Sequence, residues 1–224
     1  MLHNKYAVKI QDLFLVESAG NGPQIYVDMD GVLADLFNHV ASLHDVDHYN
    51  HMTGDQWERF LKDTNAYELF RDLPAFPTAN QLLEFTQRYG GYSILSSPLN
   101  YDKKSSIKGK QEWLQKHITV PAKKIIFEHE KYIYAKQSDG TPNILIDDYG
   151  VNIKKWRDAG GYAIKYQADQ DSLKSVENGL REAFTHFEKT KISKDTQPKK
   201  DHESPGIRNR EKTQSTDSEP MLSR

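Results

Sequence analysis

The sequence contains no cysteine, and several kinds of chemistry depend on that residue. Without it, the 224-residue chain forms no disulfide, no thiolate zinc site and no cysteine nucleophile. Catalysis must therefore use oxygen, nitrogen or a metal ion, and a reducing cytoplasm is the expected location. Long apolar runs are also missing. None approaches the roughly 18–20 residues that span a bilayer, and the run at 13–16 is too short for a signal peptide.

A surplus of positive charge is missing as well. The chain has 30 Lys and Arg against 32 Asp and Glu, a formal net charge of −2. No global positive field therefore attracts the chain to a polyanion, which disfavours duplex nucleic acid as the main partner. A small charged substrate remains compatible with this balance.

The composition divides the chain into three parts. Residues 1–23 precede the first predicted strand and form an N-terminal extension. Residues 24–189 carry the regular apolar patterns of a folded core. Residues 190–224 contain only four hydrophobic residues among many polar ones, too few to offset the entropy of ordering. We therefore predict that 190–224 is a disordered polar tail.

Short apolar runs alternate with helical patterns in the core, which is typical of βαβ units and a parallel sheet. Several runs are apolar at consecutive positions, as expected for strands that helices cover on both faces. The clearest helix is predicted at 172–187, where apolar residues recur at spacings of three and four. The predicted strands are 24–28, 92–96, 124–127, 143–147 and 162–166. The predicted fold class is α/β, Rossmann-like, with helices flanking a parallel sheet.

An insertion separates the first two predicted strands. About 60 residues lie between them, more than a single crossover helix requires. Thr53 and Gln56 are spaced as a capping box, and Trp57, Phe60 and Leu61 follow as an apolar stripe. We predict a small helical cap at about 36–74, over the carboxyl ends of the strands, where open α/β sheets bind ligands.

Two apolar strands each end in a pair of carboxylates. The first leads into Asp28 and Asp30, followed by Gly31, which permits a tight backbone; the fourth leads into Asp147 and Asp148. An isolated Asp-x-Asp is more often an acidic loop. Parallel strands, however, bring their carboxyl ends to one edge, so all four side chains are expected around one cation. Ligands that are all oxygen suit Mg²⁺.

Hydroxyls and a lysine are expected at the same edge. Ser96 and Ser97 end the second strand, and such donors suit the oxygens of a phosphoryl group. Carboxylates and a phosphate together require a balancing cation. In the helical segment 107–118, Lys110 lies within about 60° of the inward stripe, whereas Lys108 lies about 100° away. We predict that Lys110 faces the site; the alternative is a lysine that extends past its own stem to water.

The ordered set Asp-x-Asp-Gly-x-x-x-Asp, strand-Ser, helical Lys and strand-Asp-Asp resembles the haloacid dehalogenase (HAD) superfamily of phosphotransferases, over about residues 24–166. The resemblance implies that Asp28 is the nucleophile and forms an aspartyl-phosphate. It implies that Asp30 is the general acid and base. Ser96 would hold a phosphoryl oxygen, and Lys110 would balance the charge at Asp28 and the phosphate.

The same resemblance implies a Mg²⁺ site. Asp147 or Asp148 would complete it, together with Asp28 and the backbone carbonyl of Asp30. Within the superfamily the chain is most similar to the 5′(3′)-deoxyribonucleotidases, in versions met in tailed bacteriophages. The matching segments are DMDGVLAD at 28–35, FRDL at 70–73, SSP at 96–98, Lys110 three residues before Trp113, and IDD at 146–148. Two departures, Ser96 where Thr is frequent and Tyr149 where Arg is common, bear on substrate range.

A nucleobase needs a flat apolar slot, and the predicted cap is rich in aromatic residues. Phe70 is the first candidate, because the resemblance places an aromatic ring there facing the base. Ser97, and Lys131 after the third strand, are expected near the phosphate or sugar. The alternative is that most of these rings form the cap's own core. The cap aromatics are Phe37, Trp57, Phe60, Tyr67 and Phe70.

A second possible metal site lies in the cap. His44, His48 and His51 have spacings that permit shared ligation on a helix, and Asp45 and Asp47 lie between them. The segment lacks an apolar frame, so an exposed polar loop is the favoured interpretation.

The predicted function is that of a Mg²⁺-dependent phosphatase. It would hydrolyse nucleoside monophosphates, foremost deoxyribonucleoside 5′- or 3′-monophosphates, in the cytoplasm, or in the host cytoplasm if a phage encodes it. We expect no stable nucleic-acid complex and no membrane association; a homodimer stays open. One alternative is a polynucleotide 3′-phosphatase, which the acidic core and a cap over a small ligand disfavour. Another is a non-catalytic nucleotide-binding module, which would require a broken catalytic set.

Overall fold

The computed structural model describes residues 22–195, and its strands form one parallel sheet in the order β3-β2-β1-β4-β5. The register pairs Val27 with both Ile94 and Ile146, so the residues that follow the central strands emerge at one edge. All five predicted strands are present, and the predicted α/β class is confirmed. The strands are β1 (Ile25–Val27), β2 (Tyr92–Ser96), β3 (Ile125–Phe127), β4 (Ile144–Asp147) and β5 (Tyr162–Lys165).

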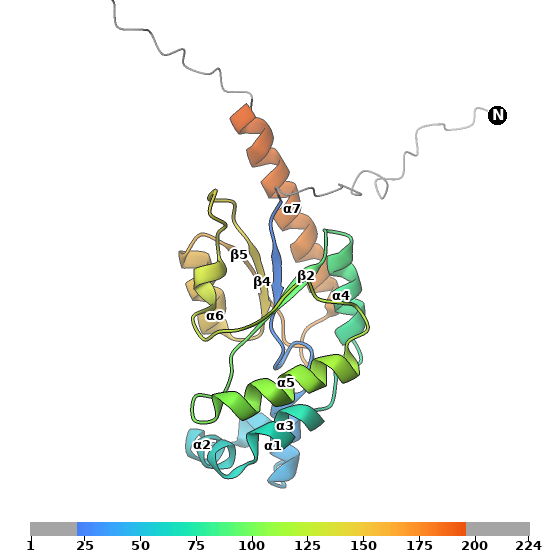
Figure 1. Cartoon of the computed structure of the whole chain (residues 1–224). Helices are drawn as coiled ribbons and strands as arrows, with labels where there is room; N and C mark the ends of the chain where they lie inside the picture. Colours follow the sequence, from blue (N-terminus) through green and yellow to red (C-terminus); the bar gives the residue numbers. More distant parts are fainter. Residues whose placement is uncertain (1–21, 196–224) are drawn as a thin grey trace, which may run out of the picture.

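Helices cover both faces of the sheet (Figure 1). One face carries α4 (Ala79–Gln87) and α7 (Leu173–Asp195), and the other carries α6 (Gly150–Asp158) and the short 3₁₀ helix η3 (Lys131–Tyr134). Successive strand residues point to opposite faces. Val27 therefore joins the apolar core under α4 and α7, while Tyr26 packs against Trp156 of α6. Because both faces of β1 are buried, none of its three residues carries a charged side chain.

A group of helices lies at the carboxyl edge of the sheet (Figure 1). An antiparallel bridge between Ala34 and Ala75 joins the two ends of the insertion that carries most of them. The predicted capping box is present: Thr53 caps the backbone of Gln56, whose side chain accepts from the Thr53 backbone. The inserted helices are α1 (Leu36–Leu43), η2 (Tyr49–His51), α2 (Gly54–Asp63) and α3 (Ala66–Asp72), and α5 (Lys103–His117) packs against α3.

The last helix, α7, continues to Asp195, beyond position 190 where the sequence predicts the start of the polar tail. Residues 188–195 contain neither proline nor glycine and several good helix formers, so the helix continues although few of these residues are apolar. Apart from residues 22–23 and 190–195, the predicted extension and tail lie outside the described residues. Within 22–195, none of the helices has the length and apolar character that a membrane span requires.

Candidate active site

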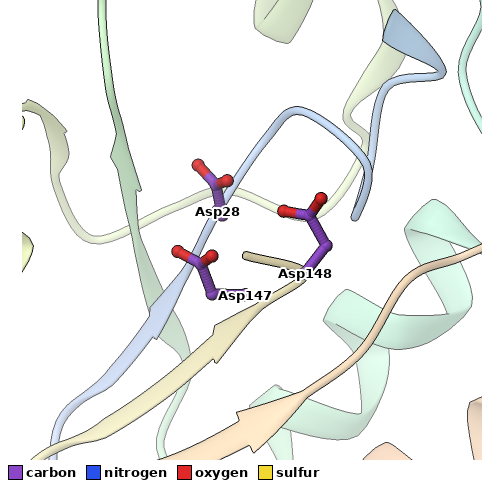
Figure 2. Close-up of side chains that lie close together, drawn as sticks. All are labelled: Asp28, Asp147 and Asp148. Atoms are coloured by element: carbon purple, nitrogen blue, oxygen red, sulfur yellow. The ribbon is translucent and has the colours of Figure 1, made fainter. Parts of the chain in front are cut away.

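Three carboxylates from two adjacent strands meet at the carboxyl edge of the sheet (Figure 2). Asp28 directly follows β1, Asp147 is the last residue of β4, and Asp148 follows it. One oxygen of each lies within 4.8 Å of the others, and within 22–195 no other group of three potential metal ligands is this close. The predicted convergence of the two Asp pairs is therefore present for these three. The carboxylate of Asp30 lies outside the group.

The group is well suited to a hard divalent cation. Asp28 and Asp147 are buried, and Asp148 is mostly so. Burial, together with the charges of Asp28 and Asp147, raises the pKa of Asp148 to about 8. Burial and Asp28 likewise raise the pKa of Asp147. Like charges this close are costly unless a cation lies between them, and a donor set made only of oxygen fits Mg²⁺.

Lys131, on η3, supplies the positive charge beside Asp28. Its Nζ lies 2.7 Å from Oδ1 of Asp28 and donates a 2.7 Å hydrogen bond to Oδ2 of Asp147. Burial of the lysine opposes its charged form, but the two carboxylates outweigh that effect and raise the pKa of Lys131. The resemblance implied that Lys110 balances the charge at Asp28 and the phosphate; in the structure Lys131 contacts Asp28, and Lys110 contacts Asp30. The physical reason is position: Lys131 lies beside the end of β4, whereas Lys110 approaches from the β2 side.

Lys110, on α5, is fully buried and holds the other side of the site. Its Nζ donates to Oδ2 of Asp30 at 2.5 Å, to Oγ of Ser96 at 2.9 Å and to the backbone carbonyl of Ser97 at 2.9 Å. The prediction that Lys110 points inward is confirmed. Burial raises the pKa of Asp30 although Lys110 opposes the shift. The second carboxylate oxygen of Asp30, Oδ1, is buried and has no hydrogen-bond partner among the described residues.

Gly31 allows the two halves of the site to approach each other. Its φ is +75°, a conformation that favours glycine. A Cβ atom at this position would lie 2.6 Å from Oδ2 of Asp148 and 2.7 Å from Cε2 of Phe37. The sequence predicts a tight backbone after the first Asp pair. In the structure, the missing side chain of Gly31 leaves room there for the Asp148 carboxylate.

A cleft of about 500 Å³ opens over these groups. The inserted helices line one side of it, and the sheet edge and the first turn of α6 line the other. Each residue predicted to bind substrate contributes to the lining: Phe37, Trp57, Phe70, Ser97 and Lys131. The structure therefore brings the predicted phosphoryl site and three of the five cap aromatics into one cavity.

The cap aromatics occupy different environments. Phe37 and Trp57 are half-buried and stack on each other, with ring centroids 5.7 Å apart. Phe60 is buried in the core, as the alternative interpretation held, and makes an edge contact with His44. Tyr67 does not line the cleft, and its hydroxyl donates to Glu112 of α5. Of these four residues, Phe37 and Trp57 therefore present aromatic surface to the cleft, and Phe60 and Tyr67 do not.

The three cap histidines are not arranged as ligands of one metal ion. The rings of His48 and His51 lie 6.2 Å apart, and His44 packs on Phe60. Within the described range, they belong to no group of potential metal ligands.

Sequence reasoning missed Asn152. Its side-chain amide donates to Oδ2 of Asp147 at 3.1 Å, while the backbone N–H of Tyr149 donates to Oδ1 at 2.8 Å. These bonds fix the orientation of the Asp147 carboxylate. The short distance in sequence between Asp147 and Asn152 could have indicated this role, because Asn152 lies in the first turn of the helix that begins soon after the Asp pair.

Residues 23–172 match the model of a family described as 5′ nucleotidase, deoxy (pyrimidine), cytosolic type C protein. No curated protein sequence matches the chain. Similar solved structures include a hydrolase from Streptococcus pneumoniae, with 15% identity, a TM-score of 0.43 and coverage of 72% of this chain and 100% of that one. Another is a haloacid dehalogenase-like hydrolase from Xanthomonas campestris, with 11% identity, a TM-score of 0.46 and coverage of 77% and 96%. The family match confirms the resemblance that the motifs carried.

Proposed function

The chain belongs to this family of 5′ nucleotidases, and we propose that it is a Mg²⁺-dependent enzyme that hydrolyses deoxyribonucleoside monophosphates to nucleoside and phosphate. Family membership makes it a hydrolase of phosphoric monoesters. The proposed Mg²⁺ dependence and nucleotide substrate rest on one observation: the buried group of Asp28, Asp147 and Asp148 lies at the base of a cleft with an aromatic wall. We expect it to act in the cytoplasm.

The proposed metal ligands are the carboxylates of Asp28, Asp147 and Asp148 and the backbone carbonyl of Asp30. Mg²⁺ bound there would offset the carboxylate charge and stabilise the charge on the phosphoryl oxygens during transfer. Asn152 and the Tyr149 backbone hold Asp147 in place. Such hydrogen bonds to a ligand orient it and tune its affinity for the metal.

In the first step, a carboxylate oxygen of Asp28 attacks phosphorus and the bond to the nucleoside oxygen breaks. Asp30 donates a proton to that leaving oxygen. The raised pKa of Asp30, which burial causes, suits this role because the group must hold a proton when the bond breaks. Lys131, whose Nζ lies 2.7 Å from Oδ1 of Asp28, holds a positive charge beside the nucleophile.

In the second step, water attacks phosphorus of the aspartyl-phosphate, and Asp30 accepts the proton that the water loses. Phosphate leaves and the Asp28 carboxylate is restored, so the nucleophile divides one displacement into two. Ser96 is fully buried and accepts a hydrogen bond from Lys110; we propose that its own hydroxyl donates to a phosphoryl oxygen when substrate is bound. Positioned donors of this kind stabilise the transition state.

The cleft supports a mononucleotide substrate. Its volume of about 500 Å³ falls within the range for small-molecule sites. Phe37 and Trp57 offer partly exposed aromatic surface on the cap side, which suits the flat faces of a base. The net charge of −2 gives no general attraction for a nucleic-acid chain.

Phosphate release from a substrate panel tests the proposal. The panel contains 5′- and 3′-nucleoside monophosphates, deoxy and ribo, together with a sugar phosphate and a 3′-phosphorylated oligonucleotide. Each is assayed with Mg²⁺, with EDTA and with Asp28→Asn. We expect release from deoxyribonucleotides that EDTA and the variant both abolish. Release from the oligonucleotide alone would indicate a polynucleotide 3′-phosphatase. Release from no substrate by folded protein would contradict the proposal.

A further inference from the structure

The ring of Phe70 lies against the ammonium group of Lys110. Nζ of Lys110 is 4.5 Å from the ring centroid, and the Phe70 residue is only 1% exposed. The same ammonium donates to Asp30, Ser96 and the Ser97 carbonyl, which accounts for its three N–H bonds. The ring face is therefore a further, apolar wall of the lysine's binding site. A cation–π contact is strongest when, as here, water is excluded from it.

Close packing of two helices brings the ring to this position. A Cβ atom on Gly109 of α5 would collide with the backbone carbonyl of Tyr67 and lie 3.1 Å from Cβ of Phe70. The absent side chain therefore lets α3 of the cap approach α5 at the residue before Lys110. Nε1 of Trp113 donates to the carbonyl of Leu73 at 2.8 Å and ties the same two segments together.

The burial of Phe70 argues against a role in stacking. A base that stacks on an aromatic residue needs an accessible ring face, and Phe70 offers almost none. Lys110 already occupies one face of its ring. Phe37 and Trp57 are more exposed and line the same cleft. The resemblance implied that Phe70 faces the base, and the geometry instead directs it to the lysine.

We propose that Phe70 is a positioning residue, through which the cap fixes the Lys110 ammonium against Asp30 and Ser96, and that it does not stack on the base. The inference rests on the proposed function only in assigning Asp30 and Ser96 to the phosphoryl site. It predicts that altering Phe70 weakens binding of the phosphoryl group itself. Base stacking predicts a loss confined to ligands that carry a base.

Inorganic phosphate is the probe that separates these two roles, because it carries no base. Its affinity for the full-length, Mg²⁺-loaded protein is measured by calorimetry and as a competitive inhibition constant. We expect Phe70→Leu to weaken phosphate binding by roughly 10- to 30-fold, and Phe70→Tyr to restore it to within about threefold. Phosphate affinity that is unchanged in Phe70→Leu, with a raised KM for nucleotides, would overturn the inference.

A double-mutant cycle tests whether Phe70 acts through Lys110 or through general stability. In a Lys110→Met background, Phe70→Leu is expected to cause no further loss of phosphate affinity. An equal loss in both backgrounds would contradict the proposal. Phe85→Leu is the matched control, because Arg88 lies over that ring at 5.2 Å and Phe85 does not line the cleft. It is expected to leave phosphate affinity unchanged.

Fluorination of Phe70 keeps the test valid if Phe70→Leu does not fold. Successive ring fluorines, introduced at position 70 alone, remove the negative potential of the face while nearly preserving ring shape. We expect phosphate affinity to fall stepwise with each fluorine; affinity independent of fluorination would refute the cation–π role. Calorimetry with phosphate needs no turnover, so this result stays separate from failure of the nucleotidase assignment.

Discussion

Replacement of Lys131 by methionine removes the cation that contacts Asp28. Methionine keeps much of the side-chain length, so the main change is loss of the charge. In the native protein Nζ of Lys131 lies 2.7 Å from one oxygen of Asp28 and 2.7 Å from one oxygen of Asp147. The lysine is 2% exposed, so both of its ion pairs are shielded from bulk water. The variant therefore leaves two buried carboxylates without their partner.

The expected cost follows from that burial. Removing one partner of a buried ion pair lowers the free energy of unfolding by about 3–5 kcal/mol. For a chain of this size each kcal/mol corresponds to about 2–4 °C, so the melting temperature should fall by roughly 6–20 °C without metal. Low pH should lessen the loss, because burial raises the pKa of Asp147 and its protonation removes one of the two charges. Bound Mg²⁺ should lessen it as well, because its charge would offset that of the same two carboxylates.

Thermal unfolding of Lys131→Met at pH 8, with EDTA and then with Mg²⁺, measures both effects. The matched control is Lys154→Met, which removes an exposed ion pair with Asp158 of 2.6 Å. That pair should contribute less than about 0.5 kcal/mol. We also expect kcat of Lys131→Met to fall by about 100-fold or more. The smallest expected change in melting temperature is ~6 °C. The reasoning would be refuted if metal-free Lys131→Met melted within about 1 °C of metal-free wild type.

Further predictions concern the metal, the backbone and the base. Burial, with Asp28 and Asp147 nearby, raises the pKa of Asp148 to about 8 without metal. The contribution of Asp148 to stability is therefore present at low pH and is lost as the pH rises from the ordinary pKa of an aspartate toward 8. Thermal unfolding should show a larger gain in stability from Mg²⁺ at pH 8 than at pH 5.5, and an equal gain would contradict this. Gly31→Ala should lower the free energy of unfolding by at least about 1–2 kcal/mol in denaturant titrations, because φ is +75°, and should weaken Mg²⁺ binding by displacing Asp148; unchanged Mg²⁺ affinity would speak against that contact. Trp57→Ala should raise the nucleotide KM about 3- to 10-fold and leave phosphate inhibition unchanged; equal changes in both constants would argue against a base slot.

The sheet and the Asp cluster could be predicted because they depend on local pattern. Apolar strands separated by helices indicate a parallel sheet, and parallel strands deliver their following residues to one edge. Asp28 and Asp147 follow from that rule alone. Helical periodicity likewise placed Lys110 on the inward side of α5, where it is fully buried.

The partners of the two lysines could not be predicted in the same way. Which carboxylate Lys110 meets depends on how α5 crosses the sheet edge, and the contact joins residues 80 positions apart. Lys131 lies in a 3₁₀ helix of four residues, too short for a periodic pattern. The burial of Phe70 depends on Gly109 of another helix. These contacts come from tertiary packing, which the spacing of residues within one element does not encode.

The most direct test of the account is to trap the phosphoenzyme. Wild type and Asp28→Asn are mixed with ³²P-labelled deoxyribonucleoside monophosphate and Mg²⁺, quenched in acid during turnover, and mapped by peptide. The account predicts label on the peptide that contains Asp28, removed by hydroxylamine as an acyl phosphate is, and absent from the variant. Label on a serine peptide, or turnover by the Asp28→Asn variant at the wild-type rate, would contradict it.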